Sequence, residues 1–285
     1  MKVWLDGKLV EKEQAAIGVY DHGLLYGDGV FEGIRVYSGR VFRVERHLER
    51  LYDGARAIRL VLPYDKAELT EAMKATVAAN AIRDGYIRLV VTRGNGALGL
   101  NPFTCERPKV FIIADSIQLY PVELYETGLK VIIASTVRTN ANALSPRIKS
   151  LNYLNNIMAR IEAIDAGVAE AIMLNSAGLV AEATGDNVFI VRRGEVITPT
   201  LNAGVLEGIT RDLVMELGRE LGLPVVEGDI SRYDLYTCEE CFLTGTAAEV
   251  VPVTVVDNRP VGDGKPGKIT RQLMTAFKKK IREEA

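Results

Sequence analysis

Lys149 is the first residue whose type and position could do chemistry. It lies in "SPRIKSLNYLNN" (residues 145–156), between an extended run and an expected amphipathic helix, and Tyr153 follows it by one helical turn. A lysine at a helix entrance is often a solvated charge, but the same amine can act as a nucleophile. Glu182, in "VAEATGDNVF", adds a carboxylate at the end of an alternating segment, where it could face a site.

Two glycine-containing segments could bind a phosphate group. In "LEGITRDLVMEL", Gly208, Ile209 and Thr210 open an expected amphipathic helix, where free backbone amides and the helix dipole favour an anion. Thr210 could equally be an ordinary N-cap. In "LTGTAAE", the small residues at 245–247 would let backbone amides approach a ligand.

An amine nucleophile, a carboxylate and two phosphate-binding turns are together the parts of a pyridoxal phosphate site. In such a site the lysine forms a Schiff base with the cofactor. The acidic partner keeps the pyridine nitrogen protonated, so that the ring can accept electrons. The combination favours a catalytic role for Lys149 over a solvated charge.

The composition is that of an ordinary globular protein. Of the 285 residues 48% are hydrophobic and 25% are charged, and the formal net charge is -2. Nucleic-acid binding would call for a basic stripe, and none is visible; the terminal "KKKIREE" is interpreted as a solvated helix face. No window has the roughly 18 apolar residues that span a membrane. With 3 cysteines and no signal-peptide pattern, we expect a cytoplasmic protein.

The pattern predicts a small N-terminal α/β domain over residues 1–120, an interdomain loop over 121–128, and a larger domain over 129–285 that carries Lys149. In the first domain we expect hairpins turning at Asp6-Gly7 and Ser38-Gly39, helices over about 48–58 and from about 66, and strands near 85–94 and 108–115. The strand "GYIRLVVTRG" points Tyr86, Arg88 and Val90 to one side.

The second domain is expected to begin with the strand "LKVIIAST" and to contain hairpins between residues 170 and 198, a helix after Thr210, and a final helix after Gly267. The helix that follows Lys149 should end at Gly167. Its apolar residues are expected to face inward: Leu151, Leu154, Ile157, Met158, Ile161 and Ile164.

Three other motifs give weaker evidence of function. "GNGALG" (residues 94–99) matches a dinucleotide fingerprint, but "LNPFTCERP" follows it and no helix can start there, so we interpret it as a loop. "CEEC" (238–241) has zinc-ligand spacing, yet one cysteine and two histidines are all that remain; small hydrophobes entering a strand are the simpler interpretation, and we predict no metal. His22 and His47 lie near no G-x-S-x-G elbow.

Together, these segments resemble the class IV pyridoxal phosphate aminotransferases, and most closely the branched-chain amino acid members. The resemblance covers nearly the whole chain, through "YDHGLLYGDGVFEGIRVY", "FRVERHLERL", "YIRLVVTRG", "IKSLNYLNN", "AEATGDNVF", "LEGITRD" and "LTGTAAEVVPV". It implies a fold-type IV enzyme with a small α/β domain and a larger pseudo-barrel domain, the cofactor lying between them. It also implies a homo-oligomer, at least a dimer.

The resemblance assigns a role to each cofactor residue. Lys149 matches the Schiff-base lysine, and Glu182 matches the partner of the pyridine nitrogen. Tyr153 matches the tyrosine near the ring oxygen, and Leu206 matches the leucine on the ring face. Arg50 matches the arginine that clamps the phosphate. The matching residues of the phosphate turns are Gly208, Ile209, Thr210 and Thr246.

The substrate residues follow in the same way. They are Tyr26, Phe31, Tyr86, Arg88, Leu98, Leu100 and Ala247. Arg88 matches an arginine that accepts the distal carboxylate of 2-oxoglutarate, and the amide of Ala247 matches a binder of the α-carboxylate. The two leucines suit an aliphatic side chain, in a loop that in this family reaches in from a neighbouring subunit. Tyr120 and Tyr125 are the candidates for an aromatic residue in the interdomain loop.

The resemblance predicts transamination of L-leucine, L-isoleucine and L-valine with 2-oxoglutarate, in ping-pong half-reactions through Lys149. Its partners would be small amino acids and 2-oxo acids. Two rivals share the scaffold, a D-amino acid transaminase and a 4-amino-4-deoxychorismate lyase. A rival of a different class is a nucleotide-binding module built on "GNGALG".

Overall fold

The computed structural model describes residues 1–284 and divides the chain into two compact units. The first unit comprises Met1–Ile117 with Ile148–Asn152 and Glu284, and the second comprises Gln118–Arg147 and Tyr153–Glu283. No helix within residues 1–284 is long and apolar enough to cross a membrane.

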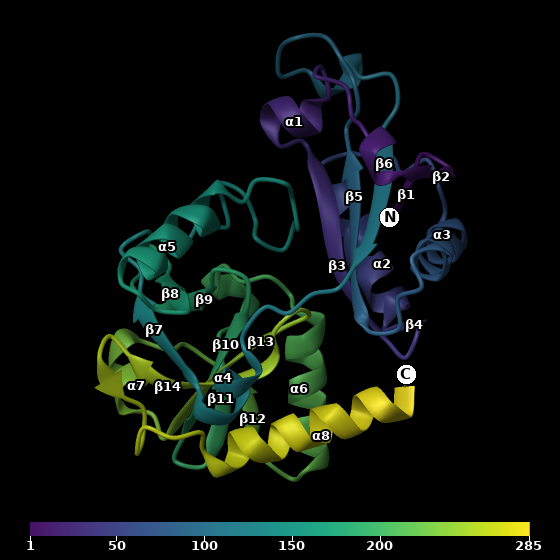
Figure 1. Cartoon of the computed structure of the whole chain (residues 1–285). Coiled ribbons are helices and arrows are strands. Elements are labelled where there is room, and N and C mark those ends of the chain that lie inside the picture. Colours follow the sequence, from purple (N-terminus) through teal and green to yellow (C-terminus); the bar gives the residue numbers. More distant parts are fainter. Residues whose placement is uncertain (285) are drawn as a thin grey trace. The chain divides into compact units, whose positions relative to one another are not determined.

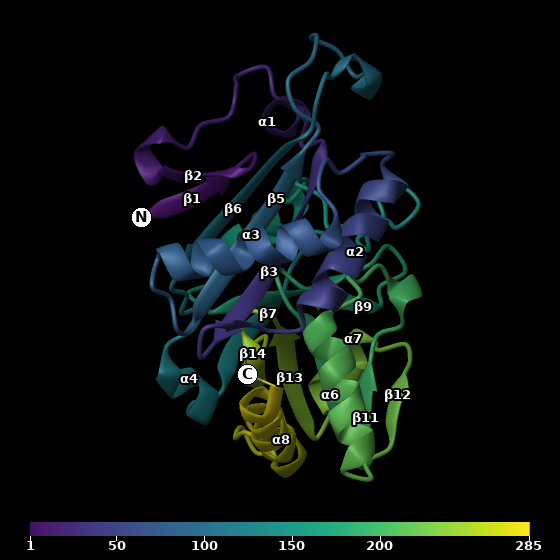
Figure 2. The same ribbon diagram turned by 90° about the vertical axis from the view of Figure 1, so that its right-hand side faces the viewer.

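The first unit is one antiparallel sheet with two helices on one face. Its strands are β1 (Lys2–Leu5), β2 (Lys8–Glu11), β3 (Gly29–Tyr37), β4 (Arg40–Val41), β5 (Gly85–Thr92) and β6 (Lys109–Asp115), in the order β2-β1-β6-β5-β3-β4. Its helices are α1 (His22–Tyr26), α2 (Val44–Ala57) and α3 (Lys66–Ala79). Figure 2 shows α2 and α3 lying across the sheet, where they bury a core that includes Ile34, Leu48 and Leu89. The predicted hairpins at Asp6-Gly7 and Ser38-Gly39 are confirmed, with positive φ at all four residues.

The lysine segment is attached to this sheet. The N–H of Phe31 donates to the carbonyl of Lys149 (2.9 Å), and the N–H of Leu151 donates to the carbonyl of Gly29 (3.0 Å). We expected Lys149 in the larger C-terminal domain. These backbone bonds to β3 are the physical reason that residues 148–152 group with the first unit.

The second unit is built on a nine-stranded mixed sheet. Its strands are β7 (Leu129–Ile133), β8 (Glu170–Leu174), β9 (Val180–Ala183), β10 (Asn187–Arg192), β11 (Glu195–Thr198), β12 (Val225–Glu227), β13 (Glu240–Gly245), β14 (Glu249–Val256) and β15 (Arg259–Pro260). The order is β12-β11-β10-β13-β14-β7-β8-β9, with β15 beside β14. The sheet curls, because β9 at its end also contacts β10.

Five helices accompany this sheet: α4 (Val122–Thr127), α5 (Leu154–Asp165), α6 (Ile209–Glu220), α7 (Arg232–Thr237) and α8 (Lys268–Glu284, of which the last residue groups with the first unit). Figure 1 shows α6 and α8 beside the strands β10 to β13. Buried residues such as Leu213 of α6 and Leu273 and Phe277 of α8 account for this packing.

The expected inward face of α5 is wrong. The helix begins at Leu154 and ends before Gly167, but its apolar residues are exposed: Leu154, Ile157, Met158, Ile161 and Ile164. The buried positions are Asn156, Ala159 and Ala163, and the two alanines pack with Ala134, Ala171 and Met173. Small residues let the helix approach β8 closely, so its larger apolar side chains are left on the outside.

Candidate active site

Lys149 lies against an aromatic ring in the first unit. Its Nζ atom is 4.7 Å from the ring centroid of Phe31, the residue whose N–H binds the lysine carbonyl. Phe31 is buried and Lys149 is half-buried. The backbone pairing with β3 therefore fixes the position of the Lys149 main chain, and the Phe31 ring lies beside the amine at the end of the lysine side chain.

Tyr86 and Arg88 of β5 join this cluster. The guanidinium carbon of Arg88 is 4.5 Å from the Phe31 ring centroid and 5.6 Å from that of Tyr86. Gly33 of β3 makes room for Tyr86, because a Cβ at position 33 would lie 1.7 Å from the tyrosine hydroxyl oxygen. The alternation predicted for this strand thus brings Phe31, Tyr86, Arg88 and Lys149 together.

Tyr26 contacts the glycine-rich loop of the first unit. Its hydroxyl accepts a hydrogen bond of 2.9 Å from the N–H of Gly99. The flanking Leu98 and Leu100 are 71% and 82% exposed, so within this chain they pack against little. Only a three-residue 3-10 helix, Pro102–Thr104, follows the loop, so no longer helix begins there that could bind a dinucleotide.

Arg50 of α2 is held by a buried carboxylate that the sequence analysis did not single out. Its Nε and Nη2 atoms each donate to Glu32 at 2.8 Å, and Nδ1 of His47 lies 2.7 Å from the second carboxylate oxygen. Burial alone would raise the pKa of Glu32, but Arg50 and His47 outweigh it and lower this pKa to about 2. Burial lowers the pKa of His47. The signal available in the sequence was an acid that alternates with the apolar residues Val30 and Ile34.

In the second unit, Glu182 lies in β9 and forms a buried ion pair with Arg138. The Nη2 and Nε atoms of Arg138 lie 2.7 and 2.9 Å from Oε1 of Glu182. Nη1 of the same arginine donates to the side-chain oxygens of Asn155 and Asn156. Arg138 lies in the irregular segment after β7, where no periodic pattern marks it, and our sequence analysis missed it.

Leu206 and the start of α6 lie next to this carboxylate. The N–H of Leu206 donates to Oε2 of Glu182 at 2.8 Å. Gly208 is the N-cap of α6, so the alternative that Thr210 is the N-cap is wrong, and no side chain caps this helix. A Cβ at Gly208 would lie 2.0 Å from the Asn187 side chain, whose amide donates to the Leu206 carbonyl. Glycine is therefore required, and the amides of Ile209 and Thr210 open the helix.

The remaining predicted residues lie in a turn, at a helix start, in a short helix and in the core of the second unit. Thr246 and Ala247 are half-buried in the turn between β13 and β14, and Gly245 allows close approach to Asp186. Tyr153 is the half-buried N-cap residue of α5. Tyr120 is buried in the core and its hydroxyl donates to Glu170 and Asp186, both at 3.1 Å. Tyr125 packs partly on the same core.

The cysteine pair belongs to the core of the second unit. Cys238 and Cys241 are both buried, as expected of small hydrophobes at the start of a strand. Burial raises the pKa of Cys238 to about 12 and that of Cys241 well above its usual range. A redox or metal-binding role needs the thiolate, which these environments disfavour.

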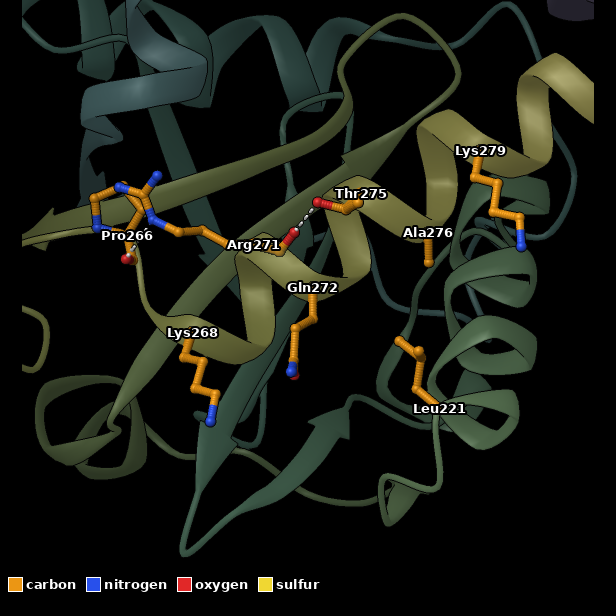
Figure 3. Close-up of a pocket in the computed structure, with 8 residues that line it drawn as sticks. All are labelled: Leu221, Pro266, Lys268, Arg271, Gln272, Thr275, Ala276 and Lys279. Carbon is orange, nitrogen blue, oxygen red and sulfur yellow. Dashed lines mark hydrogen bonds between the residues drawn. The ribbon is translucent and has the colours of Figure 1, made fainter.

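The second unit also has a groove of about 740 Å³ on its surface. Figure 3 shows that it follows one side of α8, from Pro266 and Lys268 past Ala276 to Lys279, with Leu221 opposite. None of the residues that line it is a candidate for cofactor or substrate binding.

Comparisons with known proteins agree with this geometry. The family model described as "Amino-transferase class IV" matches residues 29–256. A "Putative branched-chain-amino-acid aminotransferase" of Methanocaldococcus jannaschii is 48% identical over 278 residues, covering 98% of this chain and 96% of the relative. A D-alanine aminotransferase of Bacillus licheniformis is 36% identical, covering 100% and 98%.

A solved structure is similar over the same length. It is the branched-chain amino acid aminotransferase from Thermobaculum terrenum in its PLP-form (holo-form), with a TM-score of 0.90 and 35% identity. The match covers 100% of this chain and 94% of that one.

The chain belongs to the class IV aminotransferases, enzymes that depend on pyridoxal phosphate. Within this family it is most like the branched-chain-amino-acid aminotransferases. The family, fold class, enzyme class and cofactor predicted from the sequence are confirmed. Each unit by itself has groups of the kinds that this cofactor needs. In the second unit the start of α6, where Gly208 is required, presents helix-start amides of the kind that bind a phosphate, and the first unit has the guanidinium of Arg50 and the amine of Lys149.

The ion pair of Arg138 and Glu182 leads to a stability prediction. Changing Arg138 to Met should lower the free energy of unfolding by about 3–5 kcal/mol, because a buried carboxylate then lacks its partner. Arg147→Met is the matched control: its pair with Glu207 is 57% and 41% exposed, so the loss should be about 0–1 kcal/mol. Urea unfolding of both variants without cofactor measures the difference, and equal losses would contradict this account.

Proposed function

We propose that this enzyme transfers the amino group of L-leucine, L-isoleucine and L-valine to 2-oxoglutarate. The observation that carries the proposal is the cluster beside Lys149. Phe31 and Tyr86 offer aromatic walls to an aliphatic side chain, and Arg88 offers a cation to a second carboxylate. The names of the branched-chain aminotransferases above support the same amino acid substrates.

Bound pyridoxal phosphate would store the amino group between the two half-reactions and draw electrons from the substrate. In our proposal, Nζ of Lys149 would hold the cofactor covalently and would move the proton at the substrate α-carbon. Glu182, fixed by Arg138, pairs with the pyridine nitrogen. Tyr153 binds near the ring oxygen and Leu206 packs on the ring.

The phosphate and the substrate would be held by separate groups. For the phosphate we propose Arg50, the turn at Gly208, Ile209 and Thr210, and Thr246. For the α-carboxylate we propose the amide of Ala247, and for the distal carboxylate of 2-oxoglutarate Arg88. For the aliphatic side chain we propose Tyr26, Phe31, Tyr86, Leu98 and Leu100.

A D-amino acid transaminase is the second candidate, because the Bacillus licheniformis D-alanine aminotransferase is similar over the full length. The apolar Leu98 and Leu100 favour the L-branched-chain proposal, since they suit an aliphatic side chain. A 4-amino-4-deoxychorismate lyase would use the same lysine but would release pyruvate.

Half-reaction spectra decide among these candidates. The near-visible band of the loaded enzyme should be lost on adding L-leucine and restored by 2-oxoglutarate, while D-alanine should leave it unchanged.

Arg88→Leu should lower kcat/KM for 2-oxoglutarate by about 10-fold or more and change the leucine half-reaction little, because only 2-oxoglutarate has a second carboxylate. A response to D-alanine alone would overturn the proposal in favour of the D-transaminase. Pyruvate release from 4-amino-4-deoxychorismate without 2-oxoglutarate would favour the lyase.

We also propose a homo-oligomer, at least a dimer, that buries the exposed face of α5. Five apolar residues gather on this one helix, a concentration that is unusual on the surface of a monomer. Exposed Leu98 and Leu100 are suited to a second copy as well. The cytoplasmic location and the domain division near residue 120 also remain proposals, which rest on the sequence.

The sedimentation coefficient of the protein tests whether α5 forms the interface between copies. The double change Ile157→Glu and Ile161→Glu should shift the protein to a monomer, because it places two charges in an apolar interface. Leu221→Glu, at a 48% exposed leucine in the groove of Figure 3, is the control and should leave the assembly intact. A wild-type monomer, or a double variant that assembles normally, would contradict this proposal.

A further inference from the structure

Glu32 is a fully buried carboxylate in a strand whose neighbours are apolar. Side chains alternate along β3, so Glu32 shares the face of Val30, Ile34 and Val36, which pack in the core beneath α2. A well-packed hydrophobic residue commonly replaces a buried ion pair with no loss of stability. Stability therefore gives little reason for an acid at position 32. The reason has to be found in the residues that the carboxylate contacts.

The hydrogen bonds described for the Glu32 side chain all go to one face of α2. His47 and Arg50 are three residues apart and so lie on the same side of that helix. Arg50 donates to Glu32 through Nε and Nη2, both at 2.8 Å, which is the bidentate arrangement that fixes the plane of a guanidinium. The side chain of Arg50 is 12% exposed, whereas those of Glu32 and His47 are 0% and 2% exposed.

His47 completes the arrangement at Oε2, one of the two Glu32 oxygens that Arg50 binds. Because Glu32 remains ionised and can only accept, the Nδ1 atom of His47, 2.7 Å away, carries the hydrogen. Oε2 of Glu32 therefore accepts from both His47 and Arg50, and Oε1 accepts from Arg50. The carboxylate cannot rotate without losing one of these bonds, so the guanidinium keeps one orientation.

We propose that Glu32 and His47 are positioning residues that hold Arg50 in the orientation in which it binds the phosphate of pyridoxal phosphate. This inference rests on the proposed phosphate-binding role of Arg50. In this role Glu32 and His47 would act through Arg50 and would not need to touch the cofactor. The pair limits the rotamers of Arg50 before the cofactor arrives, so that binding loses less side-chain entropy.

The test compares two ligands that differ only in the phosphate. Full-length protein without cofactor is titrated with pyridoxal phosphate and with pyridoxal, and the ratio of the two dissociation constants is measured. Glu32→Gln keeps the shape but removes the charge, and should weaken pyridoxal phosphate binding by roughly 10–100-fold, as losses of such supporting contacts do. Pyridoxal binding should change by less than about twofold, since it has no phosphate for Arg50 to bind.

His47→Gln is the second variant and should move the ratio in the same direction by a smaller amount, which keeps the test available should Glu32→Gln fail to fold. Glu49→Gln, at an exposed position of α2, is the matched control and should leave the ratio unchanged. The Arg50→Met variant shows how much of the preference for pyridoxal phosphate over pyridoxal is lost when the guanidinium is absent. Adding Glu32→Gln to Arg50→Met should cause no further loss, because the positioned group is gone.

The outcomes separate this inference from the proposed role of Arg50. If Arg50→Met abolishes the preference for pyridoxal phosphate while Glu32→Gln and His47→Gln retain it, the positioning role is overturned and the phosphate-binding role stands. If Arg50→Met keeps the preference, the role of Arg50 fails and the inference fails with it. Equal weakening of both ligands by Glu32→Gln would mean general damage and would also overturn the inference.

Discussion

The pairing of the lysine segment with β3 is the constraint on which the first unit's part of the site depends. Lys149 has no helix or strand of its own to position it, and the backbone bonds to Gly29 and Phe31 take their place. The same strand then supplies Phe31 to the amine and Glu32 to the opposite face of the sheet. One strand thus positions both the amine and, through α2, the arginine, because alternate residues point to opposite faces.

Each unit also fixes one of its charged residues with a buried arginine–carboxylate pair. In the first unit the carboxylate, Glu32, is the support and Arg50 is the less buried member. In the second unit Arg138 is the support, and Glu182 is the residue expected to meet the cofactor. Buried pairs of this kind contribute little net stability, so their use in both units is explained better by orientation than by folding energy.

Local patterns in the sequence predicted most elements of the fold and the segments that carry the candidate site residues. The hairpin turns, the strand that carries Tyr86 and Arg88, and the interpretation of "GNGALG" as a loop follow from short-range chemistry. The inward face of α5 was predicted wrongly, because periodicity marks an apolar face without saying what covers it. Arg138 and the Glu32–His47 pair were missed for a related reason: long-range contacts define them.

The identity of the reactive lysine is the central claim, and chemical trapping tests it most directly. The full chain would be loaded with pyridoxal phosphate, reduced with borohydride, digested and analysed by mass spectrometry. We predict that the phosphopyridoxyl group is found on Lys149, within "SPRIKSLNYL". A group attached to any other lysine, or no attachment in a preparation that has the near-visible band, would contradict the account.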